Sequence, residues 1–192
     1  MGLEDQSHEN KRVIPRGRGG AIYKRGFLIH FAAIPERGVT LWTSGGSSIF
    51  DKNKFLKLGG FDEIYKPFYW EDIDLGFRAW RSGYYCYFEP LSKVDHYHQL
   101  GAIVKSSSTF RIKSVSYKNQ FLFVWKNIGD YYLITLHIVW LPYHLLRAFL
   151  NLDISFFNGF FLAILSIPNL LVTNDTNDFI ISESEVLSKF KQ

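Results

Sequence analysis

Hydrophobic and polar positions divide this chain of 192 residues into zones of different character. Residues 1–40 are basic and glycine-containing, and they include an apolar run from Phe27 to Ile34 that stops at Pro35. A short apolar run that ends at a proline is typical of a buried strand. Residues 41–105 read as short elements separated by glycines and prolines, whereas residues 117–172 are strongly apolar.

The best-defined element is a helix predicted over residues 71–82. Acidic residues crowd its first turns, basic residues lie toward its end and a glycine follows: Glu71, Asp72, Asp74, Arg78, Arg81 and Gly83. This order complements the helix dipole and supplies a left-handed stop. Ile73, Phe77 and Trp80 fall on one face and are expected to point into the core. Asp74 and Arg78 stand four residues apart, so we expect them to form a surface ion pair.

Two strands are expected after this helix. Tyr84 to Phe88 is an aromatic stretch closed by Pro90, and Lys93 to His98 reads as a second short strand or a loop. A helix followed by strands predicts an α/β domain.

The apolar tail contains two stretches of nearly membrane-spanning length, residues 131–150 and 154–172. Each is interrupted by polar or helix-breaking residues, among them Pro142, Arg147 and Pro168. A clean span needs about twenty mostly apolar residues. We therefore expect interfacial or re-entrant helices, with a pair of buried packing helices as the alternative.

Composition and charge narrow the class of partner. Hydrophobic residues make up 47% of the chain, which excludes a disordered protein. A net charge of +4 is mild for a nucleic-acid-binding protein, so we expect no nucleic acid and instead an anionic lipid surface or a phosphate-bearing substrate. Cys86 is a single cysteine and the first ten residues are polar, so we expect a reducing, cytoplasmic setting and no secretory signal.

Five motifs follow one another across about sixty residues: Gly45–Phe50, Leu58–Glu63, Trp70–Arg78, Gly83-Tyr84 with Pro90, and Val94–His96. In this order they resemble the second, acceptor-side half of the family 2 glycosyltransferases of GT-A fold, especially the bacterial rhamnosyltransferase-like members. The resemblance implies a partial GT-A (Rossmann-like) domain of α/β class, followed by C-terminal membrane-associated helices.

The resemblance also implies the chemistry of the Glu71-Asp72 pair. An inverting sugar transfer needs a carboxylate that takes the proton of the acceptor hydroxyl, and the family's base corresponds to Asp72. A position at a helix start is expected to keep this carboxylate ionised. The alternative is that Glu71 and Asp72 merely complement the helix dipole.

Other positions would form the substrate pocket. The family lines its sugar pocket with the segment that corresponds to Gly45, Gly46 and Ser47; a tight turn is the alternative. Trp70 is either a platform for a sugar ring or a core tryptophan. Arg78 supports the active-site loop in the family position, or it pairs with Asp74.

A divalent metal, Mg²⁺ or Mn²⁺, belongs to the implied cofactor set, with His96 as the residue that corresponds to the family's late histidine. The alternative is that His96 and His98 are two surface histidines. The family's nucleotide-binding half, with its Asp-x-Asp, precedes these motifs, and residues 1–40 are too short to form it. We therefore expect a fragment, a subunit that needs a separate chain carrying that half, or an inactive remnant.

These inferences give an incomplete GT-A domain over residues 1–115 and a membrane-associating helical region over residues 116–192. The expected function is inverting transfer of a sugar from a nucleoside-diphosphate sugar to a glycan or lipid-linked acceptor, in polysaccharide biosynthesis of the cell envelope. The expected location is the cytoplasmic face of the cell membrane. The alternative is a non-catalytic membrane-associated remnant or interaction protein that retains the acceptor-side scaffold.

Overall fold

The computed structural model describes residues 3–5, 17–95, 107–172 and 178–191 as a mixed helical and sheet protein. Its strands are β1 (Leu3–Asp5), β2 (Gly19–Lys24), β3 (Phe27–Ala32), β4 (Gly38–Thr40), β5 (Cys86–Phe88) and β6 (Lys93–Asp95). Its helices are α1 (Lys52–Lys57), the 3₁₀ turn η1 (Glu63–Tyr65), α2 (Glu71–Arg81), α4 (Thr109–Asn127), α5 (Tyr131–Leu150), α6 (Ile154–Leu165), α7 (Ile167–Val172) and α8 (Glu183–Lys189).

The described strands form three two-stranded sheets. β2 and β3 make an antiparallel hairpin, β4 pairs antiparallel with β5, and β1 pairs parallel with β6. The prediction of a protein that contains both helices and strands is confirmed. The sheets are small, with two strands each. The expected strand at 27–34 exists as β3, but it is only half buried, because Phe27 and Leu28 lie in the core whereas Ile29 and His30 are open to solvent.

Helix α2 is the centre of the core. Ile73, Phe77 and Trp80 are buried as predicted, and the Phe77 ring meets the Phe123 ring of α4 edge-on, with centroids 5.3 Å apart. A Cβ on Gly76 would lie 2.5 Å from the carbonyl oxygen of Leu41. Glycine at this position therefore lets the segment that follows β4 run directly against α2.

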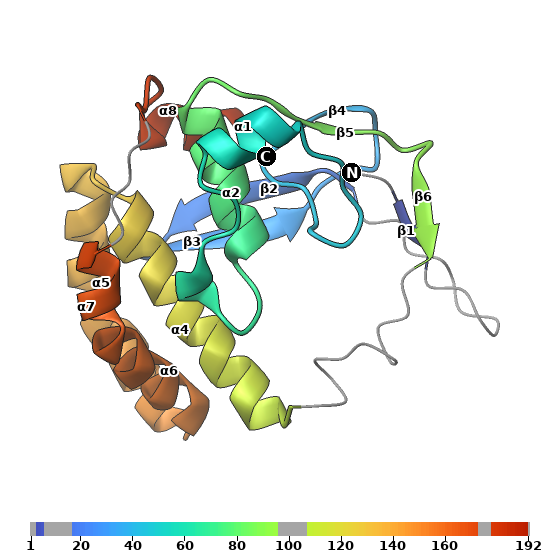
Figure 1. Cartoon of the computed structure of the whole chain (residues 1–192). Coiled ribbons are helices and arrows are strands. Elements are labelled where there is room, and N and C mark those ends of the chain that lie inside the picture. Colours follow the sequence, from blue (N-terminus) through green and yellow to red (C-terminus); the bar gives the residue numbers. More distant parts are fainter. Residues whose placement is uncertain (1–2, 6–16, 96–106, 173–177, 192) are drawn as a thin grey trace.

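The expected helices of the tail are present, with α5 over residues 131–150 and α6 and α7 within 154–172. In Figure 1 these three helices form an outer layer beside α4, and α8 returns to cover α2 and β2. α4 runs without interruption across the expected domain boundary at 115/116. This helix packs against β3, η1 and α2 on one side and against α6 on the other, so it joins the two regions into one core.

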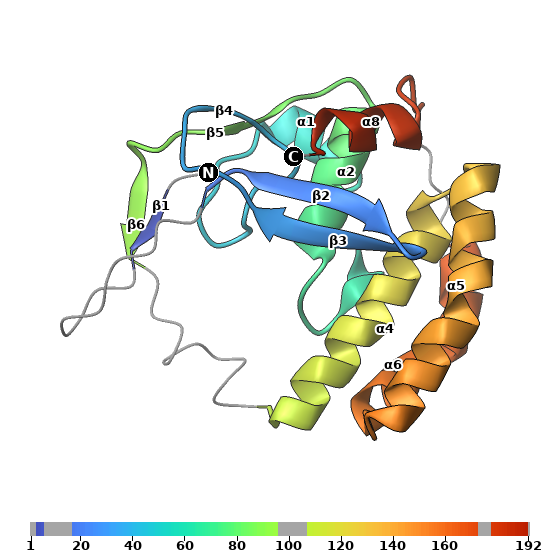
Figure 2. The same ribbon diagram turned by 180° about the vertical axis from the view of Figure 1, so that it is seen from behind.

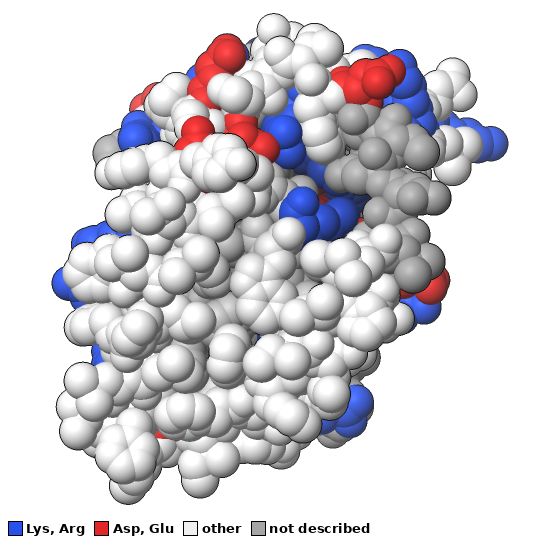
Figure 3. Space-filling model, turned by 90° about the vertical axis from the view of Figure 1, so that its left-hand side faces the viewer, with Lys and Arg blue, Asp and Glu red and all other residues white. Residues whose placement is uncertain are grey.

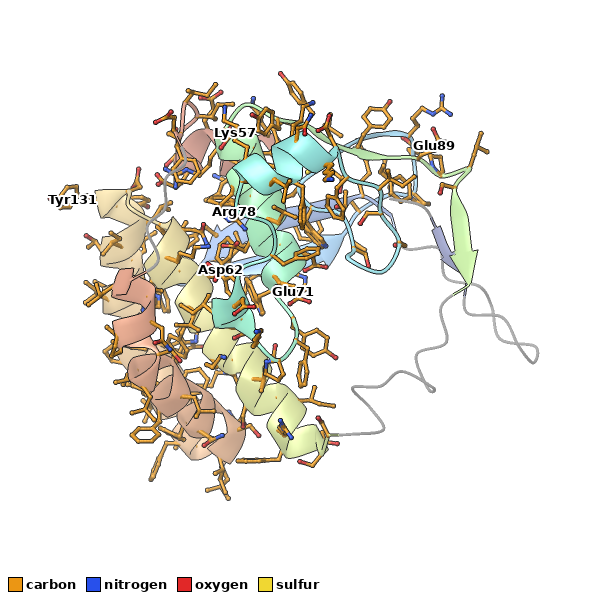
Figure 4. The ribbon with its side chains drawn as sticks, viewed as in Figure 1. Lys57, Asp62, Glu71, Arg78, Glu89 and Tyr131 are labelled. Carbon is orange, nitrogen blue, oxygen red and sulfur yellow. The ribbon has the colours of Figure 1, made fainter. Side chains whose placement is uncertain are left out.

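The outer layer leaves much apolar surface uncovered. Within the described residues, α5 alone is long and apolar enough to cross a membrane by length and composition, and 17% of its apolar window is buried. Tyr131 at its start is 91% exposed and points away from the protein (Figure 4). Figure 3 shows this side of the molecule as a broad uncharged area with Lys and Arg gathered mainly toward its edges.

Candidate functional site

The first turn of α2 places a half-buried carboxylate, that of Asp72, at a pocket. Asp72 Oδ1 accepts a hydrogen bond of 2.8 Å from the backbone N–H of Ile73. Burial, together with the charge of Glu71, raises the pKa of Asp72 to about 6, although backbone N–H groups of Ile73, Asp72 and Gly45 oppose the rise. The expected lowering by the helix dipole is therefore outweighed, yet with this pKa about nine carboxyls in ten are ionised at pH 7.

The pocket beside Asp72 has a volume of about 530 Å³, which lies within the range of small-molecule sites. Its walls are largely aromatic and its polar groups are few: Gly17, His30, Phe31, Ala32, Trp42, Ser44, Tyr69, Trp70, Asp72, Ile73 and Ser116. β3, the segment after β4, the start of α2 and α4 each supply part of this lining. The arrangement combines broad apolar ring surfaces with one carboxylate, one imidazole and three hydroxyl groups, those of Ser44, Tyr69 and Ser116.

His30 stands within this aromatic wall. Its ring meets the rings of Trp42 and Trp70 edge-on, at centroid distances of 5.5 and 5.4 Å. The His30 side chain is exposed in part, but the rings packed against it desolvate the imidazole, which lowers its pKa and keeps it neutral at pH 7. A neutral imidazole has one donor and one acceptor nitrogen and can therefore bind a hydroxyl group in either role.

The chain enters α2 through two residues in the left-handed region, Tyr69 at φ 69° and Trp70 at φ 77°. Such a conformation costs on the order of 1–3 kcal/mol for a non-glycine residue and persists only where neighbouring groups hold it. Here the side-chain amide of Asn119 donates to the carbonyl oxygens of Tyr65, Phe68 and Tyr69 at 2.7, 2.9 and 2.9 Å. α4 thus fixes the loop that presents the Tyr69 and Trp70 rings to the pocket.

Asp74 faces the opposite way, into a buried ionic network. The expected ion pair with Arg78 is confirmed, but its expected position at the surface is wrong. Arg78 Nε and Nη2 lie 2.7 Å from Asp74 Oδ2, and both side chains are at most 3% exposed. Lys126 Nζ lies 3.0 Å from Asp74 and 2.7 Å from Asp62. The Tyr65 hydroxyl and the Asn127 amide also donate to Asp74.

Arg78 does not reach the pocket, which corrects its assignment as a substrate-binding residue. Its guanidinium donates to the backbone carbonyls of Leu58 and of Gly60, the latter at 2.8 Å. Gly59 and Gly60 are in the left-handed conformation, at φ 80° and 66°. Arg78 therefore supports the glycine loop, which was the other role expected from its position. Figure 4 shows it along α2, with Asp62 close by and Glu71 at the η1 end of the helix.

The Gly45-Gly46-Ser47 segment forms the tight turn that was the alternative reading. The Ser47 N–H donates to the Ser44 carbonyl at 3.2 Å, and Ser44, not the glycines, lines the pocket. Gly45 contributes through its N–H to Asp72. A Cβ on Gly46 would meet no atom within 4 Å, so packing within the described chain does not require glycine there.

Trp70 is a core tryptophan, the alternative given for it, because it is 4% exposed and packs on Phe123; one side of it also lines the pocket. Glu71 is adjacent to the pocket and outside its lining, and Glu71 Oε2 is buried with no hydrogen-bond partner among the described residues. Sequence reasoning missed His30, Trp42 and Tyr69. His30 lay within an apolar run that predicted only a strand, and no motif marked the other two.

The expected metal ligand His96 lies outside the described residues, as does His98. Within the described ranges, no three His, Cys, Asp or Glu side chains gather in a way that would hold a metal ion. At the pocket itself, the available ligand groups are the carboxylate of Asp72 and the imidazole of His30. Two such groups do not make a metal site of the usual three or four protein ligands.

Comparison with known proteins gives no family for this chain: no family model matches it. Likewise, no curated protein matches its sequence. The geometry of the pocket and the sequence motifs are therefore the basis for inferring function.

Proposed function

We propose that this chain is the acceptor-side part of an inverting glycosyltransferase of GT-A type, with Asp72 as the catalytic base. The observation that carries the proposal is a carboxylate with a pKa of about 6 in the wall of an aromatic pocket of about 530 Å³. A base is most effective when its pKa is raised toward the working pH while it stays largely ionised.

In the proposed reaction an Asp72 carboxylate oxygen accepts the proton of the acceptor hydroxyl. The hydroxyl oxygen then forms a bond to the anomeric carbon of the donor sugar from the face opposite the leaving group. The bond from that carbon to the nucleoside diphosphate breaks, and its electron pair leaves with the diphosphate. One carbon–oxygen bond forms as another breaks, and the hydroxyl proton ends on Asp72. The configuration at the anomeric carbon is inverted.

The pocket walls suit an acceptor sugar. Aromatic side chains combine a flat apolar face with a polar edge, which matches the mixed apolar and hydroxyl surfaces of a sugar ring. Trp42 and Tyr69 are the rings available for such contacts, and Trp70 supports them from the core. His30 and Ser44 add hydrogen-bonding groups for sugar hydroxyls.

The proposal requires a nucleotide-binding half with an Asp-x-Asp, supplied by further sequence or by a separate chain. A divalent ion, Mg²⁺ or Mn²⁺, would neutralise the diphosphate in that half. Since Asp72 and His30 do not form a ligand set, no step at the described residues runs through the metal. The apolar layer of α5, α6 and α7 would hold the protein at the cytoplasmic face of the cell membrane, close to a lipid-linked or glycan acceptor.

Asp72→Asn tests the proposal, because it keeps the shape of the side chain and removes the basic charge. With the nucleotide-binding half supplied in trans or by fusion, transfer should fall by roughly 10²–10⁴-fold. The wild-type rate at low substrate should rise with pH through about 6, the pKa of Asp72.

The matched control is Asp51→Asn on α1. Asp51 caps that helix through the Lys54 N–H at 3.1 Å and lies outside the pocket, and asparagine caps helices equally well. Equal activity of Asp72→Asn and Asp51→Asn would remove Asp72 as the base. Membrane association without transfer in any pairing would instead favour the non-catalytic remnant or interaction protein.

A further inference from the structure

A second pocket lies where the β2–β3 hairpin, α4 and the outer helical layer meet. Its volume is about 350 Å³, and it shares no lining residue with the Asp72 pocket. The lining comes from β3, α4, α5 and the start of α6: Phe27, Ile29, Tyr117, Gln120, His144, Arg147, Ala148, Asn151, Asp153 and Phe156. This pocket has no role in the proposed sugar transfer.

Arg147 is the cationic group of this pocket. Among the residues that the structure describes, its guanidinium donates no hydrogen bond and forms no ion pair. A guanidinium presents five N–H donors in a planar fork that matches the oxygens of a phosphate group. Five unused donors at the wall of a pocket indicate a ligand with several acceptor oxygens.

His144 lies on the same face of α5, three residues before Arg147. Its Nε2 lies 2.8 Å from the carbonyl oxygen of Arg25, so this nitrogen carries the proton and donates. Its Nδ1 has no hydrogen-bond partner in the described part of the chain.

The other polar groups of the pocket are already engaged. Asn151 donates to the Arg147 carbonyl at 2.7 Å, and Gln120 donates to the Leu28 carbonyl at 3.2 Å. The Asp153 carboxylate opposes an anion by its charge. However, Asp153 Oδ2 accepts from the Tyr117 hydroxyl at 2.8 Å, and its Oδ1 caps α6. These contacts turn the Asp153 lone pairs to protein donors and leave Arg147 as the free charge.

The surroundings place this cation at an apolar boundary. Leu146, Phe149 and Leu150, which flank Arg147 on α5, are 58%, 65% and 71% exposed. Figure 3 shows the uncharged face to which α5 contributes, and Figure 2 shows α5 and α6 beside the tip of the β2–β3 hairpin. Arginine near an apolar surface is well placed to bind the phosphate at the level of lipid headgroups.

We propose that this pocket binds a phosphate monoester group through the Arg147 guanidinium. A lipid headgroup and a soluble phosphate compound share this chemistry. The proposal is independent of the glycosyltransferase reaction, since its test measures binding and requires no transfer activity.

The test uses the full chain, with Arg147→Gln compared against Arg111→Gln. Arg111 is an exposed arginine in the first turn of α4 and lies outside the pocket, so the control removes the same charge. Both variants should fold with the wild-type circular dichroism spectrum, because each side chain is exposed. Sedimentation with phosphatidylcholine vesicles that contain phosphatidic acid measures the lipid arm, and phosphatidylglycerol at equal surface charge measures general attraction.

We expect Arg147→Gln to weaken binding to the phosphatidic acid vesicles by about tenfold, as for the loss of one bidentate charged contact. Arg111→Gln should change it less than about threefold, as for one screened surface charge. In the soluble arm, inorganic phosphate without vesicles should raise the Tm of wild type and Arg111→Gln more than that of Arg147→Gln.

The vesicle experiment and the inorganic phosphate experiment together distinguish a lipid headgroup from a soluble phosphate compound. A difference between the variants that appears with phosphatidic acid alone identifies a lipid headgroup site, and one that also appears with inorganic phosphate identifies a site for soluble phosphate compounds. Equal behaviour of the two variants in both arms would overturn the proposal, as would binding by wild type to neither probe. Loss of transfer in Asp72→Asn bears on neither result.

Discussion

Asp74→Asn is expected to destabilise the protein strongly, although the spacing of Asp74 and Arg78 predicted only a weak surface pair. The buried network contains two carboxylates, Asp62 and Asp74, and two cations, Arg78 and Lys126. In this variant, Arg78 and Lys126 remain as two buried cations and Asp62 is the single remaining carboxylate of the network. Removing one partner from a buried ionic network costs about 3–5 kcal/mol, because the remaining charge is desolvated and uncompensated.

Chemical or thermal unfolding of Asp74→Asn measures this cost. For a chain of this size, we expect its Tm to fall by roughly 10 °C. Asp51→Asn serves as the comparison, since this exposed N-cap should change the free energy of unfolding by less than about 0.5 kcal/mol. A double variant, Asp74→Asn with Lys126→Met, restores one anion to one cation and should recover part of the loss. The charge-balance reasoning is contradicted if Asp74→Asn lowers the free energy of unfolding no more than Asp51→Asn does. It is also contradicted if Lys126→Met destabilises Asp74→Asn as much as it destabilises wild type.

The same network predicts a dependence on acid. Burial raises the pKa of Asp74, but the charges of Arg78 and Lys126 and the hydrogen bond from Asn127 outweigh it, so the net pKa is lowered. A carboxyl whose pKa is lower in the folded state stabilises the fold above its unfolded pKa, near 3.9, and loses that contribution as pH falls through the folded value. Wild type should therefore lose stability below about pH 4 more steeply than Asp74→Asn.

Two further predictions concern the helical layer. Ile138→Lys, on the exposed side of α5, should lower sedimentation with neutral vesicles by roughly tenfold or more, because a lysine is costly in an apolar bilayer. Ile49→Lys, at a still more exposed position outside α5, should not, and equal effects would contradict membrane contact through α5. Gly159→Ala should cost on the order of 1–3 kcal/mol in thermal unfolding, because the new Cβ would lie 2.6 Å from Tyr117 Cβ on α4. Gly46→Ala has open space and should be nearly neutral; a stabilised Gly159→Ala would show that α4 and α6 do not meet there.

The elements that could be predicted from the sequence are those whose signals are local. The helix at 71–82 was marked by charge order, by apolar spacing and by Gly83, and the structure has it over Glu71–Arg81. The tail helix at 131–150 was marked by length and composition, and it begins at Tyr131 as expected. Such signals act between residues a few positions apart and do not depend on the rest of the fold.

The walls of the Asp72 pocket could not be predicted, because their residues come from segments far apart in the chain. His30, Trp42, Tyr69 and Ser116 meet only after β3, α2 and α4 have packed together. Similarly, the burial of Asp74 depends on Lys126 of α4, more than fifty residues away. No local pattern carries information on contacts of this kind.

Asp72 and Asp74 illustrate how the fold divides two identical side chains between different tasks. Each residue of an α-helix is turned by about 100° from the one before it, so residues two apart point to nearly opposite sides. The first turn of α2 lies between the pocket and α4, and each side therefore receives one carboxylate. On the pocket side, no cation offsets the effect of burial, so burial raises the pKa of Asp72. On the α4 side, Arg78 and Lys126 offset the same burial and lower the pKa of Asp74. The carboxyl that we propose as the proton acceptor is thus the one without a cation, and this difference is set by Arg78 of α2 and Lys126 of α4, not by the Asp-Ile-Asp sequence itself.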